Sequence, residues 1–440
     1  MAAILQPSRV LDHPIRNLIV VFSIWKALFL VIACCSPGPG YDTSTSLTLQ
    51  HVRLEGGNEL PIVLRYVVSK LTRWDAIYFV RIAARGYTFE QEWVFGWGFT
   101  RFISLCTAGL AKAGVTHYEG LEGILAVLIA HTSHLISVLL LFKLTFAVFP
   151  ASSTSFSFIS AALHVISPAG LFLSAPFAES SCAMLSFAGT LVFVQSLSFA
   201  RRSSLLGDVL VVISGLLFGA ATMFRSNGIL NGFLLLEQAI RITWNARLGL
   251  RWPSIRRLIA TGLGGMSVGG GLLLPQYIAY SEYCKEPGAL VLRPWCEAPI
   301  PSIYTFAQVH YWNNGLFRYW TAPNIPLFLL AAPMFALMVL SGNWAMNLPK
   351  PTRTSKDMVK LDVSPVLGVM GLSQLFLVLF TLLTSHVQII TRISSAYPIC
   401  LWYVAKLLQD GGYLAKGCLR YMVIYAIVQA GLFSSFLPPA

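Results

Sequence analysis

Charged residues are scarce in this sequence, and the short motifs that bind nucleotides or catalytic metals are missing. Only 11% of the 440 residues are charged, against about a quarter in an average soluble chain. The sequence has no Gly-rich phosphate-binding loop, no H-E-x-x-H pair and no cluster of metal-ligand residues. These absences exclude an ordinary soluble domain and disfavour chemistry on a soluble nucleotide. No cofactor is expected, and the sequence leaves open whether a divalent metal assists.

A signal-peptide cleavage site and an internal repeat are missing as well. The first apolar run, residues 17–35, is long enough to cross a bilayer and has no small-residue site of the A-x-A kind. We therefore expect a retained signal anchor that directs the chain into the secretory pathway. Because no strong internal repeat is visible, a transporter built from inverted repeats has little support.

Long apolar stretches dominate what the sequence does contain. Hydrophobic residues make up 56% of the chain, and the mean hydropathy is +0.68, which predicts an all-α polytopic membrane protein. The 31 Lys and Arg residues against 18 Asp and Glu give a net charge of +13. These basic residues gather in short loops, where they set orientation in the bilayer. A nucleic acid partner is therefore not expected.

The basic loops fix the expected topology. Short loops rich in Lys and Arg face the cytosol, and four loops qualify: 201–202, 241–257, 350–360 and 406–420. The apolar stretches indicate roughly eleven transmembrane helices of about 20 residues each. The expected spans are residues 17–35, 122–149, 156–172, 178–199, 206–223, 228–240, 258–280, 324–342, 363–384, 394–408 and 419–436. Residues 99–114 must then be an interfacial or re-entrant piece, so that every basic loop falls on one side.

Residues 1–440 are thus expected to form a single membrane domain with two large luminal segments, 36–98 and 281–323. In the first segment, residues 36–57 are rich in Gly, Ser and Thr, which is typical of a flexible insertion. In the second, Cys284 and Cys296 bracket a polar loop and are candidates for a disulfide in an oxidising lumen.

A short amphipathic helix is expected in the first luminal segment. Apolar residues recur at helical spacing from Trp74, and Gly86 supplies a stop, so this helix would lie on the membrane surface. Asp75 falls in its first turn, where an ionised carboxylate is favoured as a helix cap. Alternatively, Asp75 is a general base beside the aromatic faces of Trp74 and Tyr78, which would meet a sugar or lipid head groups.

Three charged residues lie at or near membrane depth. Glu179 follows two prolines that interrupt an apolar run, and Arg225 and Arg392 stand on the side where short loops should not be basic. Such charges are costly and more often functional than not, although a structural pair of Glu179 with Arg225 is the alternative. We expect at least one of the arginines to face a phosphate.

Aromatic residues are dense in the second luminal segment, at residues 293–326, with Gln308, His310, Asn313 and Asn314 between them. This composition fits an aromatic belt at the membrane interface as well as a carbohydrate-binding platform. In the first segment, Glu90 and Glu92 lie within reach of the same luminal surface, and an ordinary solvated loop is their alternative interpretation.

Taken in order along the chain, these motifs resemble a known family. The motifs are RWDAIYF with GYTFEQEW, SPAGLFLSAPFAES, RSNG, PWCEAPIPSIYTFAQVHYWNNGLFRYW, PNIPLFLLAAP and HVQIITRISSAYP. Together they are similar to the GPI mannosyltransferase 2 enzymes of the PIG-V type. The sequence departs from that pattern through the glycines of VFGWGFTRF, Gly96 and Gly98, and through the insertion at 36–57.

The resemblance implies a GT-C type glycosyltransferase in the endoplasmic reticulum membrane with a luminal active site. It implies dolichyl-phosphate mannose as donor, a GPI precursor with one mannose as acceptor and an α1,6 product linkage. It puts Asp75 at the place of the catalytic carboxylate. The candidate substrate-binding residues in the matching motifs are Trp74, Tyr87, Glu90, Glu92, Glu179, Arg225, Asn227, Gln308, Trp312, Asn313, His386 and Arg392.

The chemistry is consistent with a single catalytic carboxylate. A dolichyl phosphate is already a good leaving group, so transfer needs a base for the acceptor hydroxyl but no dedicated acid, unlike glycoside hydrolysis. Three alternatives stay open on sequence alone. They are a related enzyme with the same donor and another acceptor, a transporter of lipids or sugar-lipids, and a structural membrane subunit. Membrane lipid is an expected partner, and an accessory membrane subunit is left open.

Overall fold

The computed structural model describes residues 11–38, 44, 60–116, 118, 120–150, 153–200, 204–247, 249, 251–285, 293–348 and 364–438. Most of the insertion predicted at 36–57 falls outside these ranges, as do the basic loops at 201–202 and 350–360.

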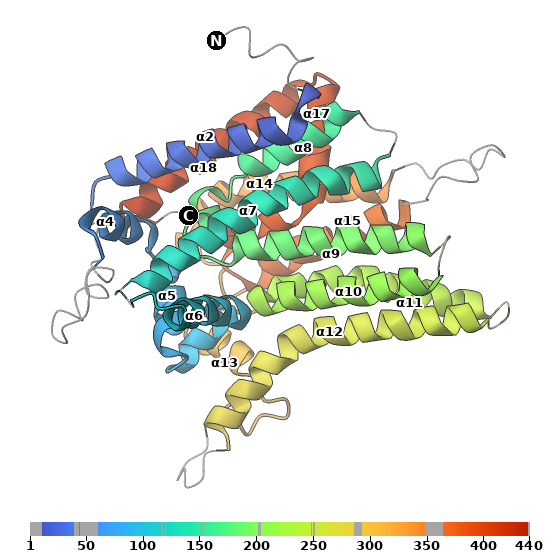
Figure 1. Ribbon diagram of the computed structural model, residues 1–440, viewed down its shortest axis with the longest axis horizontal. Helices are drawn as coiled ribbons and strands as arrows, with labels where there is room; N and C mark the ends of the chain where they lie inside the picture. The colour runs from blue at the N-terminus through green and yellow to red at the C-terminus, as the bar shows by residue number, and fades with distance from the viewer. Residues whose placement is uncertain are drawn as a thin grey trace.

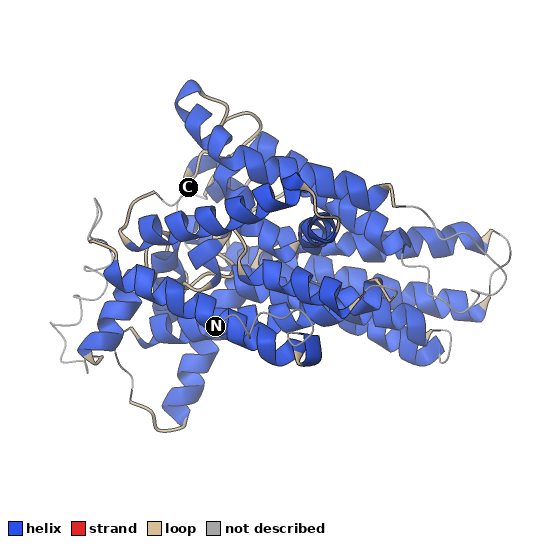
Figure 2. Ribbon diagram, turned by 90° about the horizontal axis from the view of Figure 1, so that it is seen from above, coloured by secondary structure: helices blue, strands red, loops and turns tan. Residues whose placement is uncertain are grey.

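The described residues form a bundle of long helices without a strand (Figure 2). Eight helices are long and apolar enough to cross a membrane. They are α2 (Pro14–Cys35), α7 (Leu121–Val148), α9 (Glu179–Phe199), α10 (Ser204–Phe224), α12 (Trp252–Tyr283), α14 (Ile325–Met346, preceded by the short η6, Ala322–Asn324), α15 (Ser364–Thr384) and α18 (Tyr413–Ser434). The predicted all-α polytopic fold is therefore confirmed.

The expectation of eleven spans is not confirmed. Three of the expected spans coincide with helices that are shorter than a span, namely α8 (Thr154–Val165), α11 (Gly232–Ala246) and α17 (Pro398–Gln409). Each joins an irregular stretch: η4 (Gly170–Leu173) follows α8, η5 (Ser226–Asn231) precedes α11, and η7 (Val387–Ile389), α16 (Ile390–Ile393) and η8 (Ser394–Ala396) precede α17. Hydropathy counted the apolar residues of these breaks as part of a span.

Small elements gather at one end of the bundle, here called the capped end (Figure 1). They are α4 (Ile62–Leu71), α5 (Asp75–Arg85), η3 (Glu90–Val94), α6 (Trp97–Lys112) and α13 (Ile303–His310). Helices α4 and α6 are seen nearly end-on in Figure 1, whereas the long helices run across the view. Helix α6 contains most of residues 99–114 and is not among the eight long apolar helices; the interfacial position of these residues stays a prediction.

Aromatic rings fix α5 to the capped end. Phe79 of α5 contacts Phe95, Phe99 and Phe177, with ring centroids 5.4, 5.4 and 5.8 Å apart in edge-on geometry. Phe79 is 3% exposed, and edge-to-face pairs of this kind add stability beyond the burial of apolar area. The first residue of α5, Asp75, is thereby held at a defined place above the bundle.

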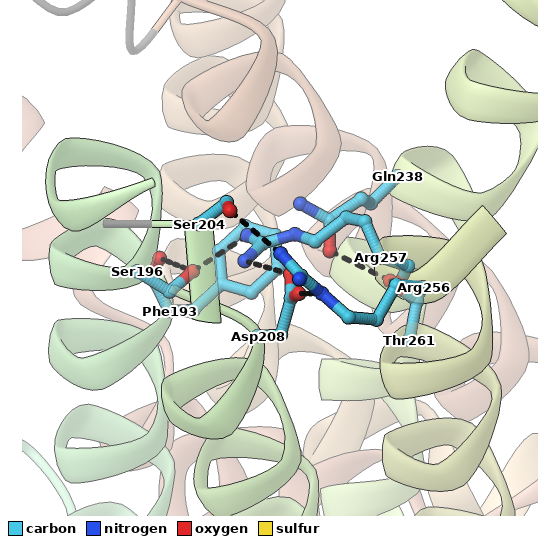
Figure 3. A network of polar contacts seen from close by, with 8 residues as sticks. All are labelled: Phe193, Ser196, Ser204, Asp208, Gln238, Arg256, Arg257 and Thr261. Atoms are coloured by element: carbon cyan, nitrogen blue, oxygen red, sulfur yellow. Dashed lines mark hydrogen bonds and ion pairs between the residues drawn. The ribbon is translucent and has the colours of Figure 1, made fainter. Parts of the chain in front are cut away.

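At the opposite end, a polar network joins α9, α10 and α12 (Figure 3). Arg256 Nε donates to Asp208 Oδ2 at 2.5 Å, and Arg257 Nη1 lies 3.5 Å from Asp208 Oδ1. Arg257 Nη2 also donates to Ser196 Oγ at 2.9 Å, and Arg256 Nη2 to Ser204 Oγ at 2.6 Å. Asp208 and its two arginine partners thus tie together the ends of three long helices.

Candidate active site

Four charged side chains from distant parts of the sequence meet at the capped end. Arg392 Nη1 donates to Asp75 Oδ2 at 3.0 Å, and Arg392 Nε donates to Glu179 Oε1 at 2.8 Å. Arg225 Nη1 lies 2.6 Å from the same Glu179 oxygen. The result is a continuous chain from Asp75 through Arg392 and Glu179 to Arg225. The predicted contact of Glu179 with Arg225 is therefore present, within a larger group.

Asp75 is the first residue of α5, but its carboxylate bonds to Arg392 rather than capping the helix. The preceding residue, Trp74, has a φ of 56°, a region that costs a residue other than glycine about 1–3 kcal/mol. The Trp74 ring packs against Phe436 with centroids 5.2 Å apart. The Asp75 side chain is 35% exposed, so it remains open to a substrate.

Glu179 begins α9 directly after the break that follows α8. Pro168 and Pro176 lie within this break, and proline lacks the N–H that a continuing helix would need. The Glu179 side chain is 0% exposed. Its Oε1 accepts a hydrogen bond from Arg392 and forms an ion pair with Arg225, whereas Oε2 has no hydrogen-bond partner among the described residues. Glu179 is thus the buried centre that holds the two arginines together.

Arg225 stands in extended conformation between α10 and η5. A Cβ on Gly228 would lie 2.6 Å from the carbonyl carbon of Ala221, so the turn that follows Arg225 requires glycine. Asn227 Oδ1 lies 3.4 Å from Arg225 Nε, and the Asn227 carbonyl accepts from Tyr397. The sequence motif RSNG therefore positions the Arg225 guanidinium.

The two glycines that depart from the family pattern also have a structural role. A Cβ on Gly96 would lie 1.8 Å from the carbonyl oxygen of Phe224, and one on Gly98 would lie 2.9 Å from Met223 Cβ. Only glycine lets the start of α6 approach the end of α10 this closely. That contact lies one residue before Arg225, so these glycines support the site.

Arg392 lies beside two adjoining aromatic rings. Its guanidinium carbon is 4.3 Å from the centroid of Phe172 and 4.8 Å from that of Phe177, distances at which a ring face attracts a cation. Burial alone would lower the pKa of Arg392, but Glu179 and Asp75 outweigh it and the net shift is upward. Sequence analysis missed Phe172 and Phe177, although both fall within the quoted motif SPAGLFLSAPFAES.

Aromatic side chains form a wall beside Asp75. The Tyr78 ring stacks on Phe95 at 4.6 Å, and the Trp312 ring lies edge-on to Tyr78 at 5.9 Å. Burial raises the pKa of Tyr78, and the charges of Asp75 and Glu92 add to that shift. Tyr78 and Trp312 are both partly exposed. They offer ring faces of the kind on which sugars stack.

His386 contacts the backbone of Trp312 and so supports this aromatic wall. Its Nε2 lies 3.0 Å from the Trp312 carbonyl oxygen, and its ring stacks on Tyr319 at 4.7 Å. Burial lowers the pKa of His386 below its ordinary value, while the Trp312 carbonyl and Asp75 act in the opposite direction. The imidazole is therefore neutral at neutral pH.

Tyr87, Glu90 and Glu92, also predicted to bind substrate, are engaged in contacts within the protein. Glu92 accepts from Arg85 and from the backbone N–H groups of residues 88 and 89. Tyr87 donates to the Phe95 carbonyl at 2.8 Å. These contacts favour a structural role for Tyr87 and Glu92 at the capped end.

Glu90 connects the two segments that were predicted to be luminal. Its Oε1 accepts from Trp295 Nε1 at 2.8 Å and lies 3.0 Å from Arg293 Nη1, and its Oε2 accepts from Tyr311 at 3.0 Å. Glu90 is only 8% exposed. All three of these partners belong to the second predicted luminal segment, 281–323. Its role in the fold is therefore to dock residues 293–311 on η3.

The remaining candidates lie in that second segment. A disulfide joins Cys284 and Cys296, whose Cα atoms are 5.7 Å apart. Gln308 Oε1 accepts from the side chain of Asn314, and Asn313 has a φ of 50°. Neither Gln308 nor Asn313 is bonded to the four charged residues of the site. Within the ranges described, no three His, Cys, Asp or Glu side chains lie together as a metal site would require.

Comparison with known proteins identifies the family of the chain. The family "Mannosyltransferase (PIG-V)" matches residues 15–440. The chain belongs to this family. As a PIG-V-type mannosyltransferase it is a multi-pass glycosyltransferase, which takes its sugar from a lipid-linked donor and passes it to a glycan acceptor. The transporter and the purely structural subunit are not favoured.

Relatives of this mannosyltransferase share nearly its whole length. It is 41% identical over 458 residues to the GPI mannosyltransferase 2 of Chaetomium globosum, with 97% of each chain covered. It is 42% identical to that of Aspergillus oryzae, covering 98% of this chain and 96% of the relative. An oligosaccharyltransferase structure from Archaeoglobus fulgidus aligns over 95% of this chain with a TM-score of 0.44 and 11% identity. This chain spans about half of that longer one, 53%.

Proposed function

We propose that this mannosyltransferase adds the second mannose to a GPI precursor at the luminal face of the endoplasmic reticulum membrane. The relatives that it matches over nearly their full length are GPI mannosyltransferase 2 enzymes. The observation that carries the mechanism is the geometry of Asp75. It is a partly exposed carboxylate beside an arginine, and a second, buried carboxylate holds that arginine in place.

The reaction is a displacement at the anomeric carbon of dolichyl-phosphate mannose. Asp75 takes the proton of the 6-hydroxyl of the first mannose, and that oxygen forms a bond to C1 of the donor mannose. The bond from C1 to the phosphate oxygen breaks, and its electron pair leaves with dolichyl phosphate. Inversion at C1 gives the α1,6 linkage. Arg392 and Arg225 stabilise the charge on the departing phosphate.

Charge compensation supports these roles. Glu179 is shared between the two arginines, so each guanidinium keeps hydrogen atoms that can reach a phosphate. Without Glu179, two cations would face one another in a buried place, which is unfavourable. Glu179 therefore orients both arginines, and Asp75 is left as the exposed carboxylate of the group.

A small cavity is connected to Arg225 through Tyr397 and Asn227. It is lined mainly by apolar side chains, among them Leu230, Phe233, Met370 and Ile399, together with Tyr397. Tyr397 donates to the Asn227 carbonyl, and the Asn227 side chain contacts Arg225.

The aromatic wall supports the position of the acceptor. Tyr78 lies one helical turn from Asp75 on α5, and its ring meets Trp312 from the second segment. A mannose stacked on these rings would bring a hydroxyl group to the Asp75 carboxylate. His386 and Tyr319 hold Trp312 and its neighbours in place.

Microsomal transfer assays test the proposed acceptor. Microsomes that contain the enzyme receive dolichyl-phosphate mannose with labelled mannose, and either a GPI precursor with one mannose or a dolichol-linked oligosaccharide. We expect a labelled two-mannose GPI product and no labelled oligosaccharide. Label only in the oligosaccharide would assign the enzyme to another acceptor with the same donor. Label in neither acceptor would overturn the proposed donor.

A further inference from the structure

A charged residue that the reaction above does not use lies in the middle of a membrane-spanning helix. Lys26 is the only Lys or Arg within residues 17–35 of α2, whose apolar window has a mean hydropathy of 2.6. The side chain faces the protein interior and is 8% exposed. A buried ammonium group at membrane depth is costly, and such residues usually have a function.

The contacts of Lys26 are unusual for a buried cation. Its Nζ donates to the carbonyl of Leu173 at 3.0 Å and to Ser174 Oγ at 2.6 Å, and it lies 5.3 Å from the ring centroid of Phe22. In the part of the chain that the structure describes, it contacts no carboxylate. Its partners are therefore neutral groups of one short stretch, 173–174.

That stretch belongs to the break between α8 and α9, residues 166–178. A break in a helix at membrane depth leaves backbone carbonyls without helical partners, and they must be satisfied inside the protein. The Leu173 carbonyl accepts from Lys26 and also from Ser180 Oγ at 3.0 Å. On the other side, the Leu171 N–H donates to Gln429 Oε1 at 2.8 Å. Lys26 thus anchors the break from α2.

The same break carries the groups that hold Arg392. Phe172 directly precedes Leu173 and lies 4.3 Å from the Arg392 guanidinium, and Phe177 lies 4.8 Å from it. The break then ends at Glu179, which bonds to Arg392. A shift of residues 172–174 would therefore move Arg392 relative to Asp75.

We propose that Lys26 is a positioning residue for the transfer reaction, which acts by holding the break at 172–174 so that Arg392 stays in line with Asp75. The inference rests on the proposed function, because Arg392 is taken to meet the donor phosphate. It assigns Lys26 no contact with substrate.

The first test compares Lys26→Met with Lys26→Arg in the microsomal transfer assay. Methionine keeps the length and apolar bulk but removes the donor, so kcat should fall about 10- to 100-fold, the range for a small misplacement of a catalytic group. The KM for the GPI acceptor should change less than about 3-fold, because the acceptor wall is untouched. Arginine should restore most of kcat. Lys143→Met is the control, since Lys143 of α7 is exposed.

Ser174→Ala removes the hydroxyl group that accepts a hydrogen bond from Lys26. This smaller change should leave a folded protein even if Lys26→Met does not fold. It removes one of the two acceptors and should lower kcat about 3- to 10-fold, the effect of losing one hydrogen bond. Ser157→Ala is its control, because Ser157 of α8 is buried and its Oγ has no hydrogen-bond partner among the described residues.

A double-variant cycle separates positioning from general stability. If Lys26 acts through Arg392, adding Lys26→Met to Arg392→Lys should lower kcat by less than about 3-fold more. Multiplication of the two separate effects would overturn the proposal. Equal activity of Lys26→Met and Lys143→Met with an active wild type would also overturn it. No transfer by wild type would instead overturn the proposed function.

Discussion

At the scale of single residues, the site depends on one buried carboxylate and one exposed carboxylate that share an arginine. Glu179 and Asp75 both bond to Arg392, yet their side chains are 0% and 35% exposed. A buried carboxylate between two arginines serves to orient them, whereas an exposed one can meet a hydroxyl group of a substrate. Burial therefore assigns Glu179 to orienting the arginines and Asp75 to contact with substrate, a difference that the residue types alone do not show.

Some of this assignment could be predicted from the sequence. Glu179, Arg225 and Arg392 stood out because charge is scarce and costly in an apolar chain, and Asp75 stood out through its place at the start of a surface helix and through the family resemblance. Phe172 and Phe177 did not stand out, because two more aromatic residues in a membrane protein carry no visible signal. Glu90 was expected among the substrate contacts, but its bonds to Trp295 and Tyr311 depend on packing between distant segments.

His386 makes stability sensitive to pH. Burial lowers the pKa of His386 in the folded protein. In the unfolded chain the same imidazole has its ordinary pKa of about 6.5, so below that pH the unfolded chain binds more protons than the folded protein. The free energy of unfolding therefore falls as the pH drops below about 6.5. Wild type should lose more thermal stability between pH 7 and pH 5 than His386→Gln. The measurement is the Tm of the purified protein in detergent at both pH values.

The control for this prediction is His310→Gln, since His310 is exposed on α13. It should show the same pH dependence as wild type. A His386→Gln protein whose Tm falls as much as that of wild type would contradict the role of His386.

At the scale of elements, the reactive groups lie in short helices and turns or at helix ends, and the long helices hold these short elements in place. Glu179 and Arg225 stand at the ends of α9 and α10, and Arg392 lies in the four-residue helix α16. Hydropathy predicts long spans well, because about 20 apolar residues leave few alternatives in a membrane. It places the ends of spans poorly, since residues 166–172, 228–231 and 394–397 were counted within expected spans but lie in the irregular stretches beside α8, α11 and α17. The difference between eleven expected spans and the eight long helices arises there.

Glu90 should stabilise the docking of residues 293–311 on η3. Glu90→Gln replaces an acceptor oxygen by an amide donor that faces other donors, which costs about 1–3 kcal/mol. The Tm of this variant in detergent should fall below that of wild type. Glu297→Gln is the matched control, because Glu297 is exposed in the same segment. An equal Tm for both variants would contradict the docking role of Glu90.

At the scale of the whole molecule, the two ends of the bundle have different tasks. The capped end holds the reactive groups, and the opposite end holds α9, α10 and α12 together through Asp208. Arg256 and Arg257 at that end come from the loop at 241–257, which the sequence predicts to face the cytosol. Composition thus predicted the all-α membrane class, whereas the number of spans and the convergence of Asp75, Glu179, Arg225 and Arg392 required the fold.

Asp208 should contribute to global stability without taking part in the reaction. Asp208→Asn leaves Arg256 and Arg257 without a counter-charge, and both are only partly exposed. The cost should be about 2 kcal/mol, between that of exposed and fully buried pairs. Thermal unfolding in detergent measures it, and transfer activity per folded enzyme should stay near wild type.

Asp410→Asn provides the comparison for Asp208. Its carboxylate pairs with Lys406 at the surface, where both side chains are about half exposed, so its loss should cost well under about 1 kcal/mol. If both variants unfold at the same temperature, the network of Figure 3 does not hold the three helices together.

The proposed mechanism requires Asp75 to be the base of the transfer reaction. The most direct measurement is kcat for mannose transfer from dolichyl-phosphate mannose to the one-mannose GPI precursor, by wild type and by Asp75→Asn at equal amounts of folded enzyme. Asparagine keeps the shape but cannot take the hydroxyl proton, so kcat should fall at least about 100-fold, the lower range for loss of a general base. An Asp75→Asn enzyme with wild-type kcat would show that Asp75 is not the base.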